Sequence, residues 1–311
     1  MSVTLYFSKV NINSHILKVY DDKREFDRII KDLYIKVKDN VEYIKEIIGE
    51  DEEGNTFTKE IVYKFNGLQK FGDDLEYTIT GRVIKKMTIF INDLDEKTGQ
   101  ITKKPTEHVE VIEFHYDLYK EVIAFHIPNR FGYVEFNQVF RELLNQSMST
   151  PNEKYNFEVS LFRKGLSVES IKQELKKIGK IATLRIDVIP PNPDEELLDS
   201  IHENGENYLE QLKKGKITQR SIAFSSTTPE GLDIDAEMID EELEQIGKIH
   251  SKLSSEEAIE KGYITVEGSN VSGRTFTTND TKPVKDKVDK PQGLLDFAKV
   301  CKNKIASIFL Q

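Results

Sequence analysis

Residues 77–92 of the chain read YTITGRVIKKMTIFIN. Four apolar side chains, Val83, Met87, Ile89 and Ile91, fall at odd-numbered positions, so they share one face of an extended chain. Alternation of this kind is the period of a β-strand with one buried face. The stretch therefore predicts a long strand of a central sheet.

The segments on either side of this strand predict antiparallel partners. Residues 109–116 and 121–127 are expected to pair with each other, and residues 93–106, which contain a glycine and a proline, are expected to form a loop. Upstream, residues 43–48 and 57–65 flank a turn-rich segment and predict a hairpin. The middle of the chain is therefore expected to be mainly antiparallel sheet.

Helices are predicted where apolar residues follow a period of about 3.6. Residues 23–38 and 136–146 each carry one such apolar face, whereas residues 4–10 and 16–20 are predicted to be short strands.

A strand–helix–strand unit is predicted over residues 157–188. Ser167 occupies the position of an N-cap and Gly179 that of a left-handed C-terminal residue. A crossover of this length should be right-handed and place both strands in one sheet. The expected fold is α+β: a central mixed, largely antiparallel sheet with a ferredoxin-like strand–helix–strand unit, plus a helical C-terminal part.

The expected domain organisation follows composition shifts along the chain. Residues 1–192 form an α+β sheet domain, residues 193–280 a helical and hairpin part, residues 281–293 a linker, and residues 294–311 a C-terminal helix. That helix carries one apolar stripe. It could dock on a partner chain or cover the core of its own chain.

Composition excludes several classes of protein. The net charge of -10 over 311 residues argues against wrapping a nucleic-acid duplex, although a local basic groove is compatible with it. Cys301 is the only cysteine, so neither an intramolecular disulfide nor a zinc site of several thiolates can form. Without a signal-peptide pattern or a long apolar run, we expect a cytoplasmic protein that does not insert into a membrane.

Catalytic sequence motifs are missing. The chain contains neither a Gly-x-Ser-x-Gly elbow nor a phosphate-binding Gly-x(4)-Gly-Lys-Ser/Thr loop, and the glycine-rich residues 268–273 are expected to join two strands. We therefore expect no cofactor and favour a protein without catalytic activity.

Clusters of basic residues near the central strands are the candidate nucleic-acid site. Aromatic residues in neighbouring strands could stack on bases while lysines follow the phosphate backbone. A solvated surface is the alternative interpretation. The candidate contacts are Arg82, Lys85, Lys86, Lys176, Lys177 and Lys180. This hypothesis requires residues 77–189 to form one continuous sheet with these lysines at its margins.

Histidines give a second, different hypothesis. On paired strands His115 and His126 could approach each other, and Glu113 would share a strand face with His115. Two histidines and a carboxylate can bind a divalent metal, which would make the chain a metal-dependent nuclease or other hydrolase. The alternative is the ordinary polar face of an antiparallel sheet.

Three short segments resemble a known family: YFSKVNIN at residues 6–13, PNPD at residues 191–194, and GYITVEG at residues 262–268 with Gly273, Thr277, Thr278 and Pro283. They are similar to uncharacterised bacterial proteins of about 300 residues whose genes lie in phage-defence neighbourhoods. The family has no agreed catalytic residues. The resemblance implies a defence-associated role and nothing more precise. Our leading hypothesis is a non-catalytic component of such a system that binds DNA, RNA or a partner protein, with self-association as a further option.

Overall fold

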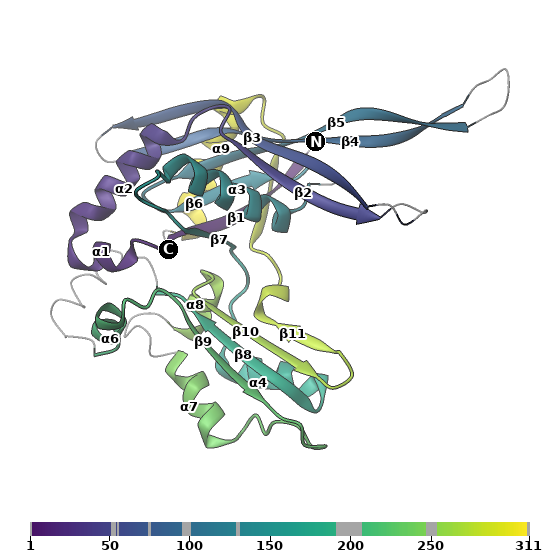
Figure 1. Cartoon of the computed structure of the whole chain (residues 1–311). Helices are drawn as coiled ribbons and strands as arrows, with labels where there is room; N and C mark the ends of the chain where they lie inside the picture. Colours follow the sequence, from purple (N-terminus) through teal and green to yellow (C-terminus); the bar gives the residue numbers. More distant parts are fainter. Residues whose placement is uncertain are drawn as a thin grey trace. The chain divides into compact units, whose positions relative to one another are not determined.

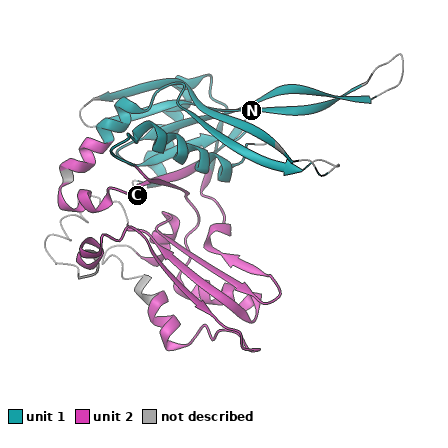
Figure 2. Cartoon of the chain, in the orientation of Figure 1, with its two compact units in different colours: residues 1–6, 30–154, 286–311 teal, residues 7–29, 155–285 magenta. Residues whose placement is uncertain are grey.

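The computed structural model describes residues 2–50, 54, 56–73, 76–94, 101–128, 131–190, 207–246 and 254–309. Contacts divide the chain into two compact units (Figure 2). Unit 1 contains residues 1–6, 30–154 and 286–311, and unit 2 contains residues 7–29 and 155–285. The units are interleaved along the chain, and the boundary passes through β1 (Ser2–Ile12) and α2 (Lys23–Lys36). The division into four consecutive segments stays a prediction, although residues 285–289 of the expected linker form a strand, β12.

The larger sheet has the strand order β12-β1-β6-β5-β4-β3-β2, with β7 also paired to β1 (Figure 1). Its remaining strands are β2 (Glu42–Glu50), β3 (Thr56–Asp73), β4 (Glu76–Leu94), β5 (Ile101–Asp117), β6 (Val122–His126), β7 (Phe157–Leu161) and β12 (Lys285–Asp289). Strands β2 to β6 are joined in sequence as antiparallel neighbours. The α+β class with a large antiparallel sheet is therefore confirmed.

Strands β4 and β5 form a ribbon that is longer than the sequence predicts. Their pairing continues from Thr78 opposite Asp117 to Leu94 opposite Ile101, so most of the expected loop at residues 93–106 is strand. Pro105 lies in β5 where that strand has no neighbour on its other side, because β6 pairs only with residues 113–117. A proline is tolerated at such an edge because it needs no ladder partner for the missing N–H.

Strands β2 to β6 of the larger sheet lie in unit 1, so we call it the unit 1 sheet. One of its faces is covered by α3 (Tyr133–Met148), and we call this the α3 face. The Phe140 ring makes edge contacts with Phe65, Phe114 and Tyr116, at centroid distances of 5.4, 5.0 and 6.0 Å. All four side chains are almost completely buried. An aromatic core therefore joins α3 to the strands.

The opposite face, which we call the α9 face, lies under α9 (Leu294–Phe309). This helix contacts β4, β5 and β6 and buries Phe297, Cys301 and Ile305. The apolar stripe of the C-terminal helix thus covers the sheet of its own unit, which is one of the two alternatives that the sequence left open.

Unit 2 is built on a four-stranded antiparallel sheet with the order β11-β10-β8-β9. Its core joins Ile171, Leu184 and Val266 with residues of two further helices. The elements are α1 (Ile16–Asp21), α4 (Val168–Ile178), β8 (Ile181–Val188), α6 (Asn207–Gly215), β9 (Arg220–Ser225), α7 (Glu237–Ile246), α8 (Ser255–Glu260), β10 (Ile264–Asn270), β11 (Thr275–Thr277) and the 3-10 turn η1 (Thr278–Asp280).

The caps predicted for α4 are confirmed. The Ser167 hydroxyl accepts a hydrogen bond from the Ser170 N–H, and Gly179 has a φ of 89°. The expectation that β7 and β8 share a sheet is wrong, because β7 joins the larger sheet and β8 the smaller. The handedness rule applies only to strands of one sheet and cannot assign strands to a sheet.

Residues 16–20 form helix α1 rather than the predicted strand. Ile16, Val19 and Tyr20 are buried, which is a helical i, i+3, i+4 spacing, and Ile16 and Tyr20 pack with Leu212 of α6. Short apolar runs do not separate helix from strand by periodicity. Within the described ranges, none of the helices combines the length and the apolar character needed to cross a membrane.

Candidate functional site

The three basic residues predicted from β4 lie in unit 1 and are paired with carboxylates. Lys85 is 7% exposed, and its Nζ lies 2.9 Å from Glu135 of α3 and 3.7 Å from Glu110. Arg82 pairs with Glu113 at 3.3 Å, and Lys86 pairs with Glu107 at 3.2 Å. Lys85 is therefore a largely buried part of the α3 face.

The other three predicted residues lie in unit 2, on α4 and directly after it. Lys176 pairs with Asp235 at 2.7 Å, and this hydrogen bond raises the pKa of its ammonium group. Lys177 pairs with Glu174 at 2.6 Å, and Lys180 is exposed. The six residues are thus divided between two units, and residues 77–189 do not form one continuous sheet. Their role as nucleic-acid contacts stays a prediction.

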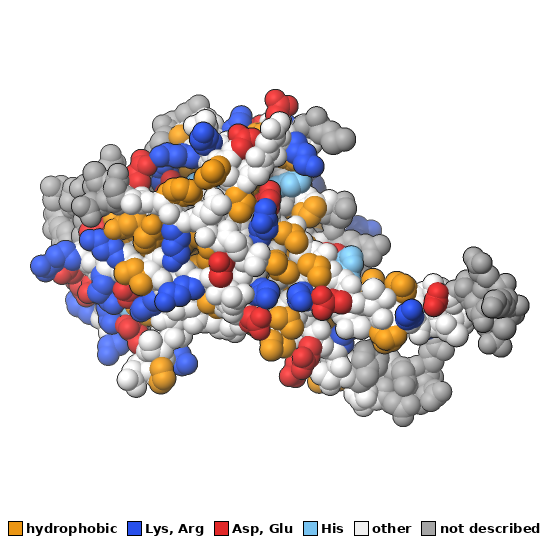
Figure 3. All heavy atoms as spheres, turned by 90° about the horizontal axis from the view of Figure 1, so that it is seen from above, with side chains coloured by type: hydrophobic (Ala, Val, Ile, Leu, Met, Phe, Trp, Pro, Cys, Tyr) orange, Lys and Arg blue, Asp and Glu red, His pale blue; other side chains and the backbone are white. Residues whose placement is uncertain are grey.

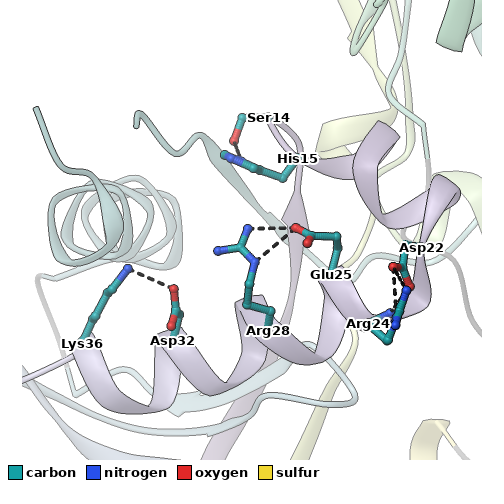
Figure 4. A network of polar contacts seen from close by, with 8 residues as sticks. All are labelled: Ser14, His15, Asp22, Arg24, Glu25, Arg28, Asp32 and Lys36. Atoms are coloured by element: carbon teal, nitrogen blue, oxygen red, sulfur yellow. Dashed lines mark hydrogen bonds and ion pairs between the residues drawn. The ribbon is translucent and has the colours of Figure 1, made fainter. Parts of the chain in front are cut away.

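Pairing of neighbouring charges recurs along α2. Figure 4 shows Arg28 pointing toward Glu25 and Lys36 toward Asp32, with nitrogen–oxygen distances of 2.9 and 3.0 Å. Each such i, i+3 or i, i+4 pair increases the stability of a helix by about 0.2–0.5 kcal/mol. The arrangement stabilises the helix surface.

The three residues of the metal hypothesis share the α9 face but have separate partners. Glu113 lies directly opposite His126, whereas His115 lies opposite Ala124. His126 Nδ1 donates to the Thr4 carbonyl oxygen at 3.1 Å, and Glu113 pairs with Arg82. Among the residues whose placement is described, no three His, Cys, Asp or Glu side chains could hold a metal ion together. These three residues therefore do not form a metal site.

The α9 face contains polar residues where the α3 face contains aromatic ones. The register places Thr80 opposite His115 and Thr78 opposite Asp117, and all four are buried. A pocket of about 480 Å³ lies between these strands and α9. It combines buried polar groups with an opening to solvent, since Phe71 and Leu295 on its wall are 47% and 59% exposed.

His115 lines this pocket. Its side chain is 2% exposed, its Nδ1 shares a 2.7 Å hydrogen bond with the Thr80 hydroxyl, and its Nε2 has no partner in the described chain. Burial lowers the pKa of the imidazole to about 4, with nearby Asp117 opposing the shift. The ring is therefore neutral at pH 7, and its Nε2 is a buried nitrogen without a hydrogen-bond partner among the described residues.

The wall formed by α9 supplies positive charge. Lys299 and Lys302 both line the pocket, and Lys302 pairs with Glu76 at 2.6 Å. Phe71, Leu295 and Ala298 supply apolar surface. Positive charge, apolar wall and one buried ring nitrogen are thus brought together from β3, β4, β5 and α9.

A second distinctive surface is formed by the two hairpins of unit 1, which project from the same end of the sheet (Figure 1). On the β4–β5 ribbon, Phe90, Ile101 and Val109 share one face and are 66%, 67% and 45% exposed. We call these three residues the ribbon stripe. On β2, Ile44 and Ile48 are 51% and 72% exposed. Figure 3 shows hydrophobic side chains along the projecting ribbon at the right of that view.

Sequence reasoning named His115 but not its pocket. The alternation of Ile112, Phe114 and Tyr116 with Glu113, His115 and Asp117 was visible, and polar residues in that pattern normally face solvent. The missing signal was that the apolar stripe of α9 covers this polar face. Spacing within single strands cannot reveal that contact.

No curated protein and no solved structure matches the chain. The family described as "Domain of unknown function (DUF4747)" matches residues 3–304. Because this match covers nearly the whole sequence, the chain is a member of the DUF4747 family.

Proposed function

We propose that the chain is a non-catalytic binding component that engages a partner protein through the two projecting hairpins of unit 1. The observation that carries this proposal is the ribbon stripe, an apolar surface on a two-stranded ribbon that extends past the rest of its sheet. Large exposed apolar groups of this kind are typical of protein interfaces.

The β4–β5 ribbon would gain stability if another protein covered its apolar face. An isolated two-stranded ribbon is marginally stable in water, and a third element packed on one face adds apolar burial. Full burial of a Phe or Ile side chain contributes about 1.5–3 kcal/mol. Burying Phe90 and Ile101 alone would therefore change the dissociation constant by at least about tenfold.

A protein partner is favoured over nucleic acid by the charges on the same strand. Arg82, Lys85 and Lys86 are each paired with a carboxylate of the same unit, and a phosphate would have to displace it. Lys103 and Lys104 also lie on the ribbon, and a ribbon of this shape can enter a major groove. Nucleic-acid binding is therefore the competing outcome of the test.

The phage-defence setting belongs to the same proposal. The resemblance implies that the partner is encoded beside the gene for this chain. Co-expression with each neighbouring product would then yield one complex, and deletion of the gene would remove protection in a plaque assay.

The test compares three full-length proteins: the natural chain, the double variant Phe90→Ser/Ile101→Ser, and the matched control Met238→Ser/Val271→Ser, whose residues are 70% and 71% exposed on unit 2. We expect one protein to co-purify at fixed stoichiometry with the natural chain and the control, and to bind the ribbon variant at least about tenfold more weakly. Equal binding to all three would contradict the proposal. Retention of nucleic acid alone, weakening steeply with salt, would also contradict it.

A further inference from the structure

We propose that the pocket between α9 and the unit 1 sheet binds a small organic anion with an aromatic or other apolar body. The site is defined by His115 of β5, Lys299 and Lys302 of α9, and the apolar surface of Phe71 and Leu295. This ligand site lies on the α9 face and is separate from the ribbon stripe.

The size of the pocket suits a small molecule. Ligand sites in proteins commonly occupy about 300–1,000 Å³, lined mainly by apolar groups with a few convergent polar ones. The pocket here measures about 480 Å³ and has that mixture of groups. It has room for a ring compound with one charged group.

The buried imidazole points to a specific polar contact. Buried side-chain nitrogens are nearly always hydrogen-bonded, and one left unpaired costs about 1–3 kcal/mol. His115 Nε2 is buried without a partner in the described residues, while Nδ1 is held at 2.7 Å by Thr80. Thr80 therefore fixes the orientation of the ring, and the proposed ligand would reach Nε2 from the pocket that His115 lines. That contact would remove the desolvation penalty.

The charges on the walls select the sign of the ligand. Among the described residues that line the pocket, Lys299 and Lys302 are cationic, and Glu76, which is paired with Lys302, is anionic. Lys299 is exposed and carries the remaining positive charge of this group. A carboxylate or phosphate near Lys299 would be attracted, and the excess charge disfavours a cationic ligand.

The apolar wall selects the rest of the ligand. Phe71 and Leu295 are large side chains that are about half exposed beside the polar groups. A ring placed against them would bury this surface, which an inorganic ion cannot do. The ligand is therefore an organic anion rather than phosphate alone.

Titration calorimetry of the full chain with phenyl phosphate, benzoate, adenosine 5′-monophosphate and inorganic phosphate tests this site. We expect saturable binding of at least one of the three ring compounds, with a dissociation constant of about 1 mM or lower. The preferred ring compound identifies the anionic group. Inorganic phosphate should bind at least about tenfold more weakly, and equal binding would overturn the apolar part of the proposal.

Matched variants locate the binding. Lys299→Glu reverses an exposed charge and should abolish saturation, whereas Lys45→Glu, an exposed lysine of β2, should bind normally. His115→Gln should weaken binding by about three- to tenfold, the loss of one hydrogen bond. No binding of any ring compound up to about 10 mM, the weak end expected for ligands of this size, would overturn the proposal. Binding that is unchanged in both Lys299→Glu and His115→Gln would do the same.

Discussion

The two faces of the unit 1 sheet come from the same strands and differ in chemistry. On the α3 face, Phe65, Phe114 and Tyr116 enclose Phe140 in a closely packed aromatic core. On the α9 face, the alternate positions carry Thr80 and His115, and the covering helix leaves a pocket. The side chains of a helix can pack closely on an apolar face of a sheet. Over a polar face, side chains of unequal length leave empty space under the helix and polar atoms without hydrogen-bond partners. We infer that the α3 face stabilises the fold and the α9 face binds.

The largest predicted effect lies on the α3 face. Phe140→Ala should lower the free energy of unfolding by about 4 kcal/mol, because it removes a buried ring and leaves a cavity. Leu295→Ala, on the pocket side and 59% exposed, should change it by less than about 0.5 kcal/mol. Denaturant unfolding measures both, and equal losses would remove the distinction between the faces.

The second prediction uses two neighbouring lysines. Lys85→Met should destabilise the fold by about 3 kcal/mol, because it removes the buried ammonium group that lies beside the carboxylates of Glu110 and Glu135. Lys86→Met removes a more exposed pair with Glu107 and should cost less than about 1 kcal/mol. Urea unfolding of the two variants measures the loss of unfolding free energy in each. A small effect of Lys85→Met would favour a role of that residue as a surface contact over a role in stability.

The third prediction concerns pH on the α9 face. The folded-state pKa of His115 is about 4, below the ordinary value of 6.5, so the unfolded chain binds more protons between these pH values. The contribution to stability is fully present above pH 6.5 and is lost as the pH falls toward 4. Its size is about 3 kcal/mol at most.

The difference in unfolding free energy between the natural chain and His115→Gln, followed from pH 7.5 to pH 4, isolates this contribution. We expect the unfolding free energy of the natural chain, relative to that of His115→Gln, to decrease as the pH falls. A difference that does not change with pH would mean that the imidazole is well hydrated, contrary to its 2% exposure.

The smallest predicted effect is at Thr80. Thr80→Val removes the 2.7 Å hydrogen bond to His115 Nδ1 and should cost about 1 kcal/mol. It should also weaken phenyl phosphate binding, because the hydrogen bond that orients the imidazole is lost. Unfolding and calorimetry on the same variant measure the two effects. Normal binding in Thr80→Val would show that the ring needs no orienting partner.

The sequence was sufficient for features determined by local periodicity and caps. The alternation over residues 77–92 predicted β4, and Ser167 with Gly179 predicted the ends of α4. It was insufficient where the local structure depends on contacts between residues that are distant in the sequence. Residues 16–20 became helix α1 because their apolar spacing meets α6, and β7 and β8 entered different sheets.

The candidate sites show the same limit. Lys85 and Lys86 are adjacent in sequence, but alternation places one under α3 beside Glu135 and the other on the opposite face of the strand. A run of lysines therefore does not identify a phosphate-binding surface. His115 was recognised as a reactive type of residue, but its pocket depends on α9, which begins only at Leu294.

Nitrogen-15 NMR of the histidine side chains tests the central claim most directly. At pH 7, the His115 imidazole, assigned by comparison with His115→Gln, should be neutral, and its Nε2 resonance should shift in a saturable way as phenyl phosphate is added. The same titration should leave methyl and ring resonances of the α3 face unchanged. A protonated His115 ring at pH 7, or an Nε2 resonance that none of the ring compounds perturbs, would contradict the assignment of the α9 face as a binding site.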